Sequence, residues 1–180
     1  MTSYCESSAP IELINSHFTD ATEHPTKNGK LYMCSLADAF SGRIVGYPIG
    51  DRMTSELAVS ALHSAITLRS PKGSICHSDR GSQFRSGAFV RTLKNNGLRG
   101  STGRVGAAGD SARMESFHSL LQNNILDSKK WESQEELRIA IVQWIEGIYH
   151  RRRGKRSLGK MTPVAYEVAA EAIDKRLLVA

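Results

Sequence analysis

Three acidic residues stand in surroundings that are unusual for a carboxylate. Asp20 lies inside an apolar strand pattern (HFTDAT), Asp79 follows a short apolar strand (ICHSDRGSQF), and Glu115 lies one turn into a predicted helix (GDSARMESFHSLL). An acid inside a strand is disfavoured, and it is costly to bury without compensation. If the three carboxylates converge, they repel one another unless a cation neutralises them.

Hard divalent ions provide that neutralisation through oxygen ligands, and Mg²⁺ typically takes one or two carboxylates with waters and phosphate oxygens. Two such ions about 3.5–4 Å apart clamp the attacking and leaving oxygens of an in-line phosphoryl displacement. The acids therefore indicate metal-dependent phosphoryl transfer, provided that they meet in space. Asp38 competes with Asp20 for the first position, but its place beside the Ser41-Gly42 turn favours a structural role. Taken alone, Asp79 is a turn aspartate and Glu115 a first-turn helix acid.

The elements that would position these acids follow from periodicity and turn signals. Strands are expected over 18–22, 30–38, 43–49 and 74–79. Pro48 should end the third strand or place it at a sheet edge, since it has no N–H for the ladder. Helices are expected between Thr54 and Pro71, over 86–96, from Asp110 or Ser111, from Ser133, and over 164–178.

Two of the helices carry long apolar stripes. The stripe of the helix at Glu115 is Met114, Phe117, Leu121 and Ile125. The stripe of the helix from Ser133 is Leu137, Ile141, Trp144, Ile145 and Ile148. Consecutive strands, then alternating strands and helices, then helices predict an α/β fold with a mixed sheet.

Composition narrows the class of protein. The chain has 180 residues, the size of one domain, and it has no apolar run of the roughly 20 residues that a membrane span needs. Three scattered cysteines do not form a disulfide framework, which favours a reducing, intracellular compartment. The net charge of +6 comes largely from six cations without an acid between His150 and Lys160, which indicates an anionic partner such as nucleic acid, or else a solvated helix end.

The spacing and context of the acids resemble a known family. Between Asp79 and Glu115 lie 115 − 79 − 1 = 35 residues, and with Asp20 this resembles the D, D(35)E signature of retroviral integrases and insertion-element transposases. The blocks TDATEHPTKNGKLYMCSLADAFSGRIVGYPI, CHSDRGSQF, STGRVGAAGDSARMESFHSLLQ and IYHRRRGKRSLGKMTPVAYE are each similar to a segment of that family. The resemblance covers about residues 17–168.

This resemblance implies an RNase H-like fold with a mixed five-stranded sheet flanked by helices. It implies that Asp20, Asp79 and Glu115 are catalytic and bind Mg²⁺ or Mn²⁺, with two ions when substrate is bound. Water would first free a 3′-hydroxyl at the element's end, and that hydroxyl would then join to other DNA. An alternative is a catalytically silent fragment that regulates by binding DNA or a full-length transposase, and a third is a nuclease that cuts without joining.

The partners expected from the resemblance are double-stranded DNA, further copies of the chain and a separate DNA-binding transposase subunit, in the bacterial cytoplasm at the nucleoid. The expected DNA contacts are Arg151, Arg152, Arg153, Lys155, Arg156, His118 and Gln122. The expected organisation is a leader over 1–16, a catalytic core over 17–150 and a basic segment with a terminal helix over 151–180. The glycine-rich segment 100–109 is either a linker or a mobile loop that closes on DNA.

Overall fold

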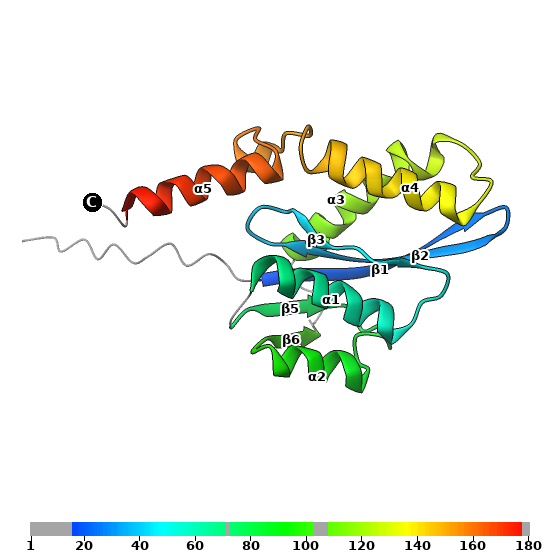
Figure 1. The fold of residues 1–180 in the computed structure, drawn as a ribbon, viewed down its shortest axis with the longest axis horizontal. Coiled ribbons are helices and arrows are strands. Elements are labelled where there is room, and N and C mark those ends of the chain that lie inside the picture. The colour runs from blue at the N-terminus through cyan, green and yellow to red at the C-terminus, as the bar shows by residue number, and fades with distance from the viewer. Residues whose placement is uncertain (1–15, 71–72, 103–107, 178–180) are drawn as a thin grey trace, which may run out of the picture.

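A computed structural model describes residues 16–70, 73–102 and 108–177, and it consists of one mixed sheet between helical layers (Figure 1). The strands are β1 (Ser16–Thr26), β2 (Gly29–Asp38), β3 (Ile44–Gly46), β4 (Ile49–Gly50), β5 (Ile75–Ser78) and β6 (Arg99–Thr102). The helices are α1 (Ser55–Arg69), α2 (Gly87–Asn95), α3 (Ala108–Asn124), α4 (Gln134–Trp144) and α5 (Pro163–Leu177). None of the described helices is both long and apolar enough to cross a lipid bilayer.

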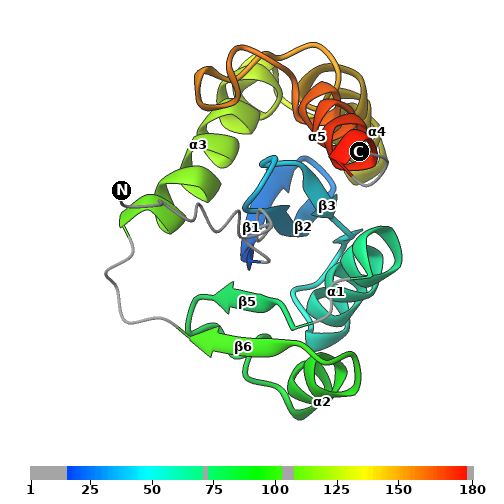
Figure 2. The ribbon, with the colours of Figure 1, turned by 90° about the vertical axis from the view of Figure 1, so that its left-hand side faces the viewer.

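The sheet has the order β3-β2-β1-β5-β6, with the short β4 also paired to β2. β1 and β2 form an antiparallel hairpin, whereas β1, β5 and β6 run parallel to one another. Figure 2 shows β5 and β6 extending the sheet away from the hairpin, with α2 beside them. The predicted leader falls outside the described residues except for Ser16, and so do residues 103–107 of the glycine-rich segment.

Alternation along β2 creates two hydrophobic cores, one on each face of the sheet. Leu31 and Met33 pack with residues of α3 and α4, while Cys34 and Leu36 pack with residues of α1 and α2. Successive strand side chains point to opposite faces, so a strand buried on both faces supplies both cores. The same parity places Phe18 of β1 on the α3 face of the sheet.

The third predicted strand is divided in two. Residues 43–49 were expected to form one strand, but β3 and β4 are separate and both pair with β2. Pro48 lies between them and its carbonyl accepts a hydrogen bond from the Cys34 N–H (3.2 Å). Because proline has no N–H to return to the ladder, the pairing is interrupted at this edge of the sheet.

The prediction that Ile148 belongs to the buried stripe of α4 is wrong. A π-helical turn (Ile145–Tyr149) follows α4, and within it the His150 N–H donates to the Ile145 carbonyl (2.9 Å). The wider turn adds one residue to the helical repeat, so Tyr149 and His150 face the core and Ile148 is 44% exposed.

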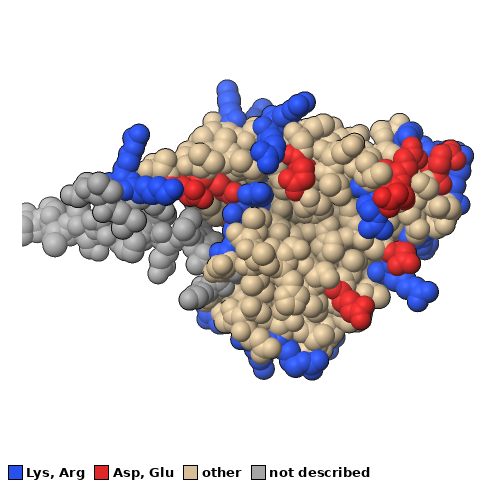
Figure 3. Space-filling model, viewed as in Figure 1, with Lys and Arg blue, Asp and Glu red and all other residues tan. Residues whose placement is uncertain are grey.

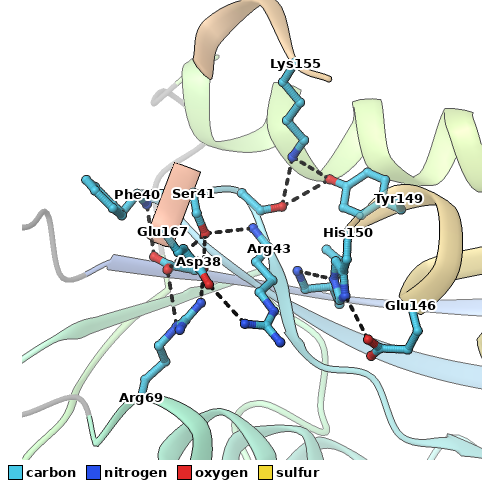
Figure 4. Close-up of polar contacts among 12 residues, drawn as sticks. Asp38, Phe40, Ser41, Arg43, Arg69, Glu146, Tyr149, His150, Lys155 and Glu167 are labelled. Carbon is cyan, nitrogen blue, oxygen red and sulfur yellow. Dashed lines mark hydrogen bonds and ion pairs between the residues drawn. The ribbon is translucent and has the colours of Figure 1, made fainter. Parts of the chain in front are cut away.

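The C-terminal helix is attached to the core through one partly buried carboxylate (Figure 4). Glu167 of α5 accepts hydrogen bonds from Arg69 of α1, from Arg43 (3.0 Å) and from the Ser41 hydroxyl (2.6 Å). Arg69 Nε also lies 3.4 Å from Asp38 Oδ2. These groups come from separate parts of the chain, so the network fixes α5 against the turn that follows β2.

Histidine 150 is buried in a fully hydrogen-bonded, neutral form. Its Nε2 accepts the Ile44 backbone N–H (3.1 Å), and its Nδ1 lies 3.2 Å from Glu146 Oε2, which assigns the proton to Nδ1. Burial lowers the pKa of His150 despite that carboxylate. Burial likewise lowers the pKa of His17, and it lowers the pKa of His24 to about 4.

These three histidines predict a loss of stability in mild acid. Each has a folded-state pKa below its unfolded value, so the unfolded chain binds more protons and stability falls as the pH falls from 6.5 toward 4. His24 alone accounts for about 3 kcal/mol between pH 7 and pH 4. Urea unfolding across this range should show that loss, and His24→Gln should reduce it. The control is His63→Gln, because His63 is exposed. If wild type and both variants lose the same stability as the pH falls, His24 is not the source of the loss.

Candidate active site

Asp20 and Asp79 lie at the same level on neighbouring strands. The parallel register pairs Thr19 of β1 with Ser78 of β5, and each aspartate is the next residue of its chain. Both have the side-chain parity of the residues facing α3, because Phe18 stacks on His77 across these strands with ring centroids 5.2 Å apart. The first acid is thus inside a strand and the second directly follows the adjacent one.

The buried thiol of Cys34 feels the charge of both aspartates. Burial is the main cause that raises the pKa of Cys34 to about 12, and the negative charges of Asp20 and Asp79 raise it further. Because electrostatic interactions weaken with distance, each of the two carboxylates lies near the Cys34 side chain of β2.

Helix α3 contacts the first aspartate through His118. Its Nε2 lies 3.2 Å from Asp20 Oδ2 and 3.3 Å from the hydroxyl of the buried Ser35. Ser35 is the residue paired with Asp20 across the hairpin. Glu115 precedes His118 by three residues, so it lies on the same side of α3 one turn earlier, where its side chain is exposed.

The described residues contain no group of three His, Cys, Asp or Glu side chains already close enough to hold a metal ion. The structure places Asp20 and Asp79 at one level of neighbouring strands and Glu115 on the adjoining helix, but among the described residues these side chains are not assembled into a metal-binding cluster. Carboxylates at this level of the sheet nevertheless suit a hard divalent cation, for which waters and phosphate oxygens complete the ligand set.

The turn after β5 fixes the Asp79 side chain. Its Oδ1 accepts the Gly81 backbone N–H (2.8 Å), which leaves Oδ2 without that restraint. A Cβ at Gly81 would lie 2.8 Å from Asp79 Oδ1 and 2.4 Å from the Gln83 amide nitrogen. A side chain at this position would crowd the Asp79 carboxylate and displace the Gln83 amide.

The Asp20 carboxylate is held in its ionised form. Burial raises its pKa, but hydrogen bonding and charge attraction from His118 and the hydrogen bond from the Ala21 N–H (2.8 Å) outweigh burial, and the pKa is lowered. Asp20 is thus an anion throughout the neutral range.

Replacing His118 by alanine should raise the pKa of Asp20, because burial would then act with less opposition. Titration of the Asp20 carboxyl carbon by NMR measures this shift directly. Gln122→Ala, one turn further along α3, is the matched control and should leave the titration unchanged. A His118→Ala protein whose Asp20 titrates as in wild type would show that His118 does not hold this carboxylate.

The predicted DNA contacts differ in how far they are exposed to solvent. The exposed residues are Arg151, Arg152, Arg153, Arg156 and Gln122. Lys155 is instead half-buried, with Nζ donating to the Gly42 carbonyl (2.9 Å) and the Tyr149 hydroxyl (2.8 Å). Figure 3 shows cationic side chains gathered over the connection between α4 and α5. His118 lies at Asp20, as described above.

Sequence patterns missed the roles of Ser35 and Glu167, and they predicted the role of Asp38. The register of the hairpin, which a two-residue turn fixes, could have assigned Ser35 opposite Asp20. No local signal pointed to Glu167. Asp38 is a structural turn acid as expected, since its Oδ1 accepts the Phe40 N–H (3.0 Å). His77 is a packed residue, stacked on Phe18.

A mixed sheet with an acid inside one strand, a second acid after its parallel neighbour and a third on the covering helix defines the RNase H-like class of α/β folds. Comparison with solved structures supports this class. The HTLV-2 integrase catalytic core domain in complex with magnesium (trimeric form) matches with a TM-score of 0.60 and 22% identity, over 83% of this chain and 93% of that chain. The α/β fold predicted from the sequence is confirmed.

Integrase core domain family models match residues 11–108 and residues 96–163. The chain belongs to the integrase core domain family. It is 35% identical to the transposase for insertion sequence element IS629 of Shigella sonnei, over 83% of this chain and 50% of that protein. It is 34% identical to the transposase InsF for insertion sequence IS3A of Escherichia coli, over 82% of this chain and 52% of that protein. The chain thus spans about half the length of these relatives, and the predicted resemblance to insertion-element transposases is confirmed.

Proposed function

We propose that this chain is the catalytic core of a DDE-type transposase that cuts DNA at the end of an insertion element and joins the freed end to other DNA. The observation that carries the proposal is the placement of Asp20 and Asp79 at one level of adjacent parallel strands, facing the helix that bears Glu115. Membership of the integrase core domain family and similarity to insertion-sequence transposases support it.

The proposed reaction has two displacements at phosphorus. In the first, a water oxygen bonds to the phosphorus and the bond to the 3′-oxygen breaks, which leaves a 3′-hydroxyl and a 5′-phosphate. In the second, that 3′-oxygen bonds to a phosphorus of the target DNA and displaces the target's own 3′-oxygen, which takes up a proton. The number of phosphodiester bonds is conserved in the second step, so it needs no external energy source.

Asp20, Asp79 and Glu115 would hold Mg²⁺ or Mn²⁺, two ions when DNA is bound. Such ions supply Lewis-acid activation of the nucleophile and stabilise the charge that develops on the phosphate. The protein's own contribution is to keep Asp20 ionised through His118 and to fix Asp79 through the Gly81 N–H. Because Glu115 is exposed, α3 can present it to an ion that the two aspartates already hold.

We also propose that DNA binds as a duplex and that several copies of the chain act together. Exposed arginines at 151–153 and 156 favour contacts to phosphates, which position DNA without reading its sequence. The HTLV-2 core is described in trimeric and dimeric forms, which supports assembly in this family. Recognition of the element's end by a separate DNA-binding subunit is part of the same proposal.

A strand-transfer assay tests the function. A duplex with a pre-cut 3′-hydroxyl at an element end should join to plasmid DNA when Mg²⁺ or Mn²⁺ is present and not after chelation. Cutting of an uncut duplex without joining would instead assign a nuclease. Absence of both reactions, together with inhibition of a full-length transposase, would assign the silent regulator.

A further inference from the structure

A groove of about 740 Å³ lies on the side of α3 away from the paired aspartates. Arg113, Ser116 and Leu120 line it from α3, and their i, i+3, i+7 spacing places them on one face of the helix. Glu115 and His118 lie across the buried stripe of α3 from that face. The other walls are the turn after β2 and residues 153–158, and we call this space the basic groove.

The basic groove has an excess of positive charge. Four cations line it, namely Arg113, Arg153, Lys155 and Arg156. Among the described residues that line it, Asp38 is the single acid, and it already lies 3.4 Å from Arg69. The ion pairs formed by the described residues include none of the four cations.

Two of these cations are held in place by neutral acceptors. Arg113 donates to the Ala39 carbonyl, and Lys155 donates to the Gly42 carbonyl and the Tyr149 hydroxyl. Figure 4 shows Lys155 directed down from its loop toward these oxygens. Its ammonium also lies 4.5 Å from the centre of the Tyr149 ring. Because these acceptors are uncharged, within the described part of the chain they orient the two cations without neutralising them.

The backbone is shaped to admit Lys155. Gly42 has a φ of +65°, and a Cβ there would lie 2.5 Å from Lys155 Nζ. Burial, together with the charges of Arg113 and Arg153, lowers the pKa of Lys155 to about 8. A half-buried ammonium that faces two guanidinium groups is unfavourable on its own, and an anion in the groove would relieve that repulsion.

We infer that the basic groove binds one phosphate of a DNA backbone, with Arg113, Arg153 and Lys155 as its ligands, at a point separate from the phosphodiester at the carboxylates. The inference rests on the proposed function for the identity of the anion as DNA. It narrows the DNA contacts predicted for residues 151–156, because it assigns one phosphate to Arg153 and Lys155 in particular. Arg151 is exposed and lies outside the groove lining.

Fluorescence anisotropy with a DNA duplex at several salt concentrations tests the inference independently of cutting. Arg153→Gln should weaken binding about tenfold and lower the magnitude of the salt slope by about 1, as expected for one lost phosphate contact. The matched control is Arg52→Gln, at an exposed arginine outside the groove and outside the predicted DNA contacts, which should change both quantities less. Lys155→Met should repeat the effect of Arg153→Gln if unfolding measurements show that it is folded.

A second readout is the pKa of Lys155, followed by NMR of the labelled side chain. Addition of duplex DNA should raise it from about 8 toward its ordinary value, because an anion stabilises the ammonium. Equal effects of Arg52→Gln and Arg153→Gln, or a Lys155 pKa that duplex DNA leaves unshifted, would overturn the inference. A shift with inorganic phosphate but not with DNA would overturn the assignment of DNA as the ligand. Failure of the strand-transfer assay alone would leave these binding results intact.

Discussion

Replacing Asp79 by asparagine is expected to reduce metal-dependent cutting by on the order of 10³-fold while leaving DNA binding in place. The amide lacks the negative charge that a divalent ion requires, and loss of such electrostatic stabilisation costs several kcal/mol. The fold should be unaffected, because the amide oxygen of asparagine can still accept the Gly81 N–H that Asp79 Oδ1 accepts. Initial rates on an element-end duplex, with binding measured in parallel, give both quantities.

Two further variants sharpen this test. Asp20→Asn should cause a loss of similar size, because Asp20 occupies the same level of the neighbouring strand. Asp51→Asn removes an exposed acid from the connection before α1 and should cut at the wild-type rate. Should Asp79→Asn and Asp51→Asn cut DNA equally well, the carboxylate site assigned here is wrong.

Replacing Phe117 by alanine is expected to lower the free energy of unfolding by about 3–5 kcal/mol. Phe117 is 1% exposed, and its ring lies 5.1 Å from that of Tyr149 and 6.1 Å from that of Trp144, measured between centroids. Removal of the ring leaves a cavity where α3 packs on α4 and the π-helical turn. Because a domain is stable by only about 5–15 kcal/mol, this single change removes a large fraction of the total.

Urea unfolding monitored by circular dichroism measures this loss. Phe117→Leu keeps most of the buried volume and should cost less than about 1.5 kcal/mol. Val168→Ala, at a position on α5 that is 61% exposed, should stay within about 0.5 kcal/mol of wild type. If the alanine and leucine variants at Phe117 have the same free energy of unfolding, the contacts of the Phe117 ring with Trp144 and Tyr149 do not stabilise the packing of α3. The rate at which Phe117→Leu cuts DNA then tests whether looser packing of α3 impairs the presentation of Glu115 to the metal ion.

Local patterns were sufficient for most secondary-structure elements and for the pairing within the hairpin. Turn signals on either side identified the strand β2, and the tight turn between β1 and β2 determines which residues oppose each other. Helix starts were also readable, since Thr54, Ser86 and Ser133 each accept a backbone N–H as an N-cap. Interactions between residues close in sequence decide these features, so the sequence displays them directly.

The spacing of Asp20, Asp79 and Glu115, with the blocks around them, was likewise sufficient to predict the family and the fold. Only the tertiary structure decided that β1 pairs in parallel with β5, which brings Asp20 and Asp79 to one level of the sheet. Their mutual position depends on a strand pairing between distant segments, and no local pattern encodes that register.

The tertiary structure also decided what the remaining polar residues do. His118 contacts Asp20, Lys155 turns inward to the Gly42 carbonyl, and Glu167 joins α5 to the core. The π-helical turn after α4 could not be read from the stripe, because the 3.6-residue periodicity predicts Ile148 inside. The three side-chain contacts join groups that are far apart in sequence and meet only when the layers pack, so the residue types were visible from the start and their partners were not.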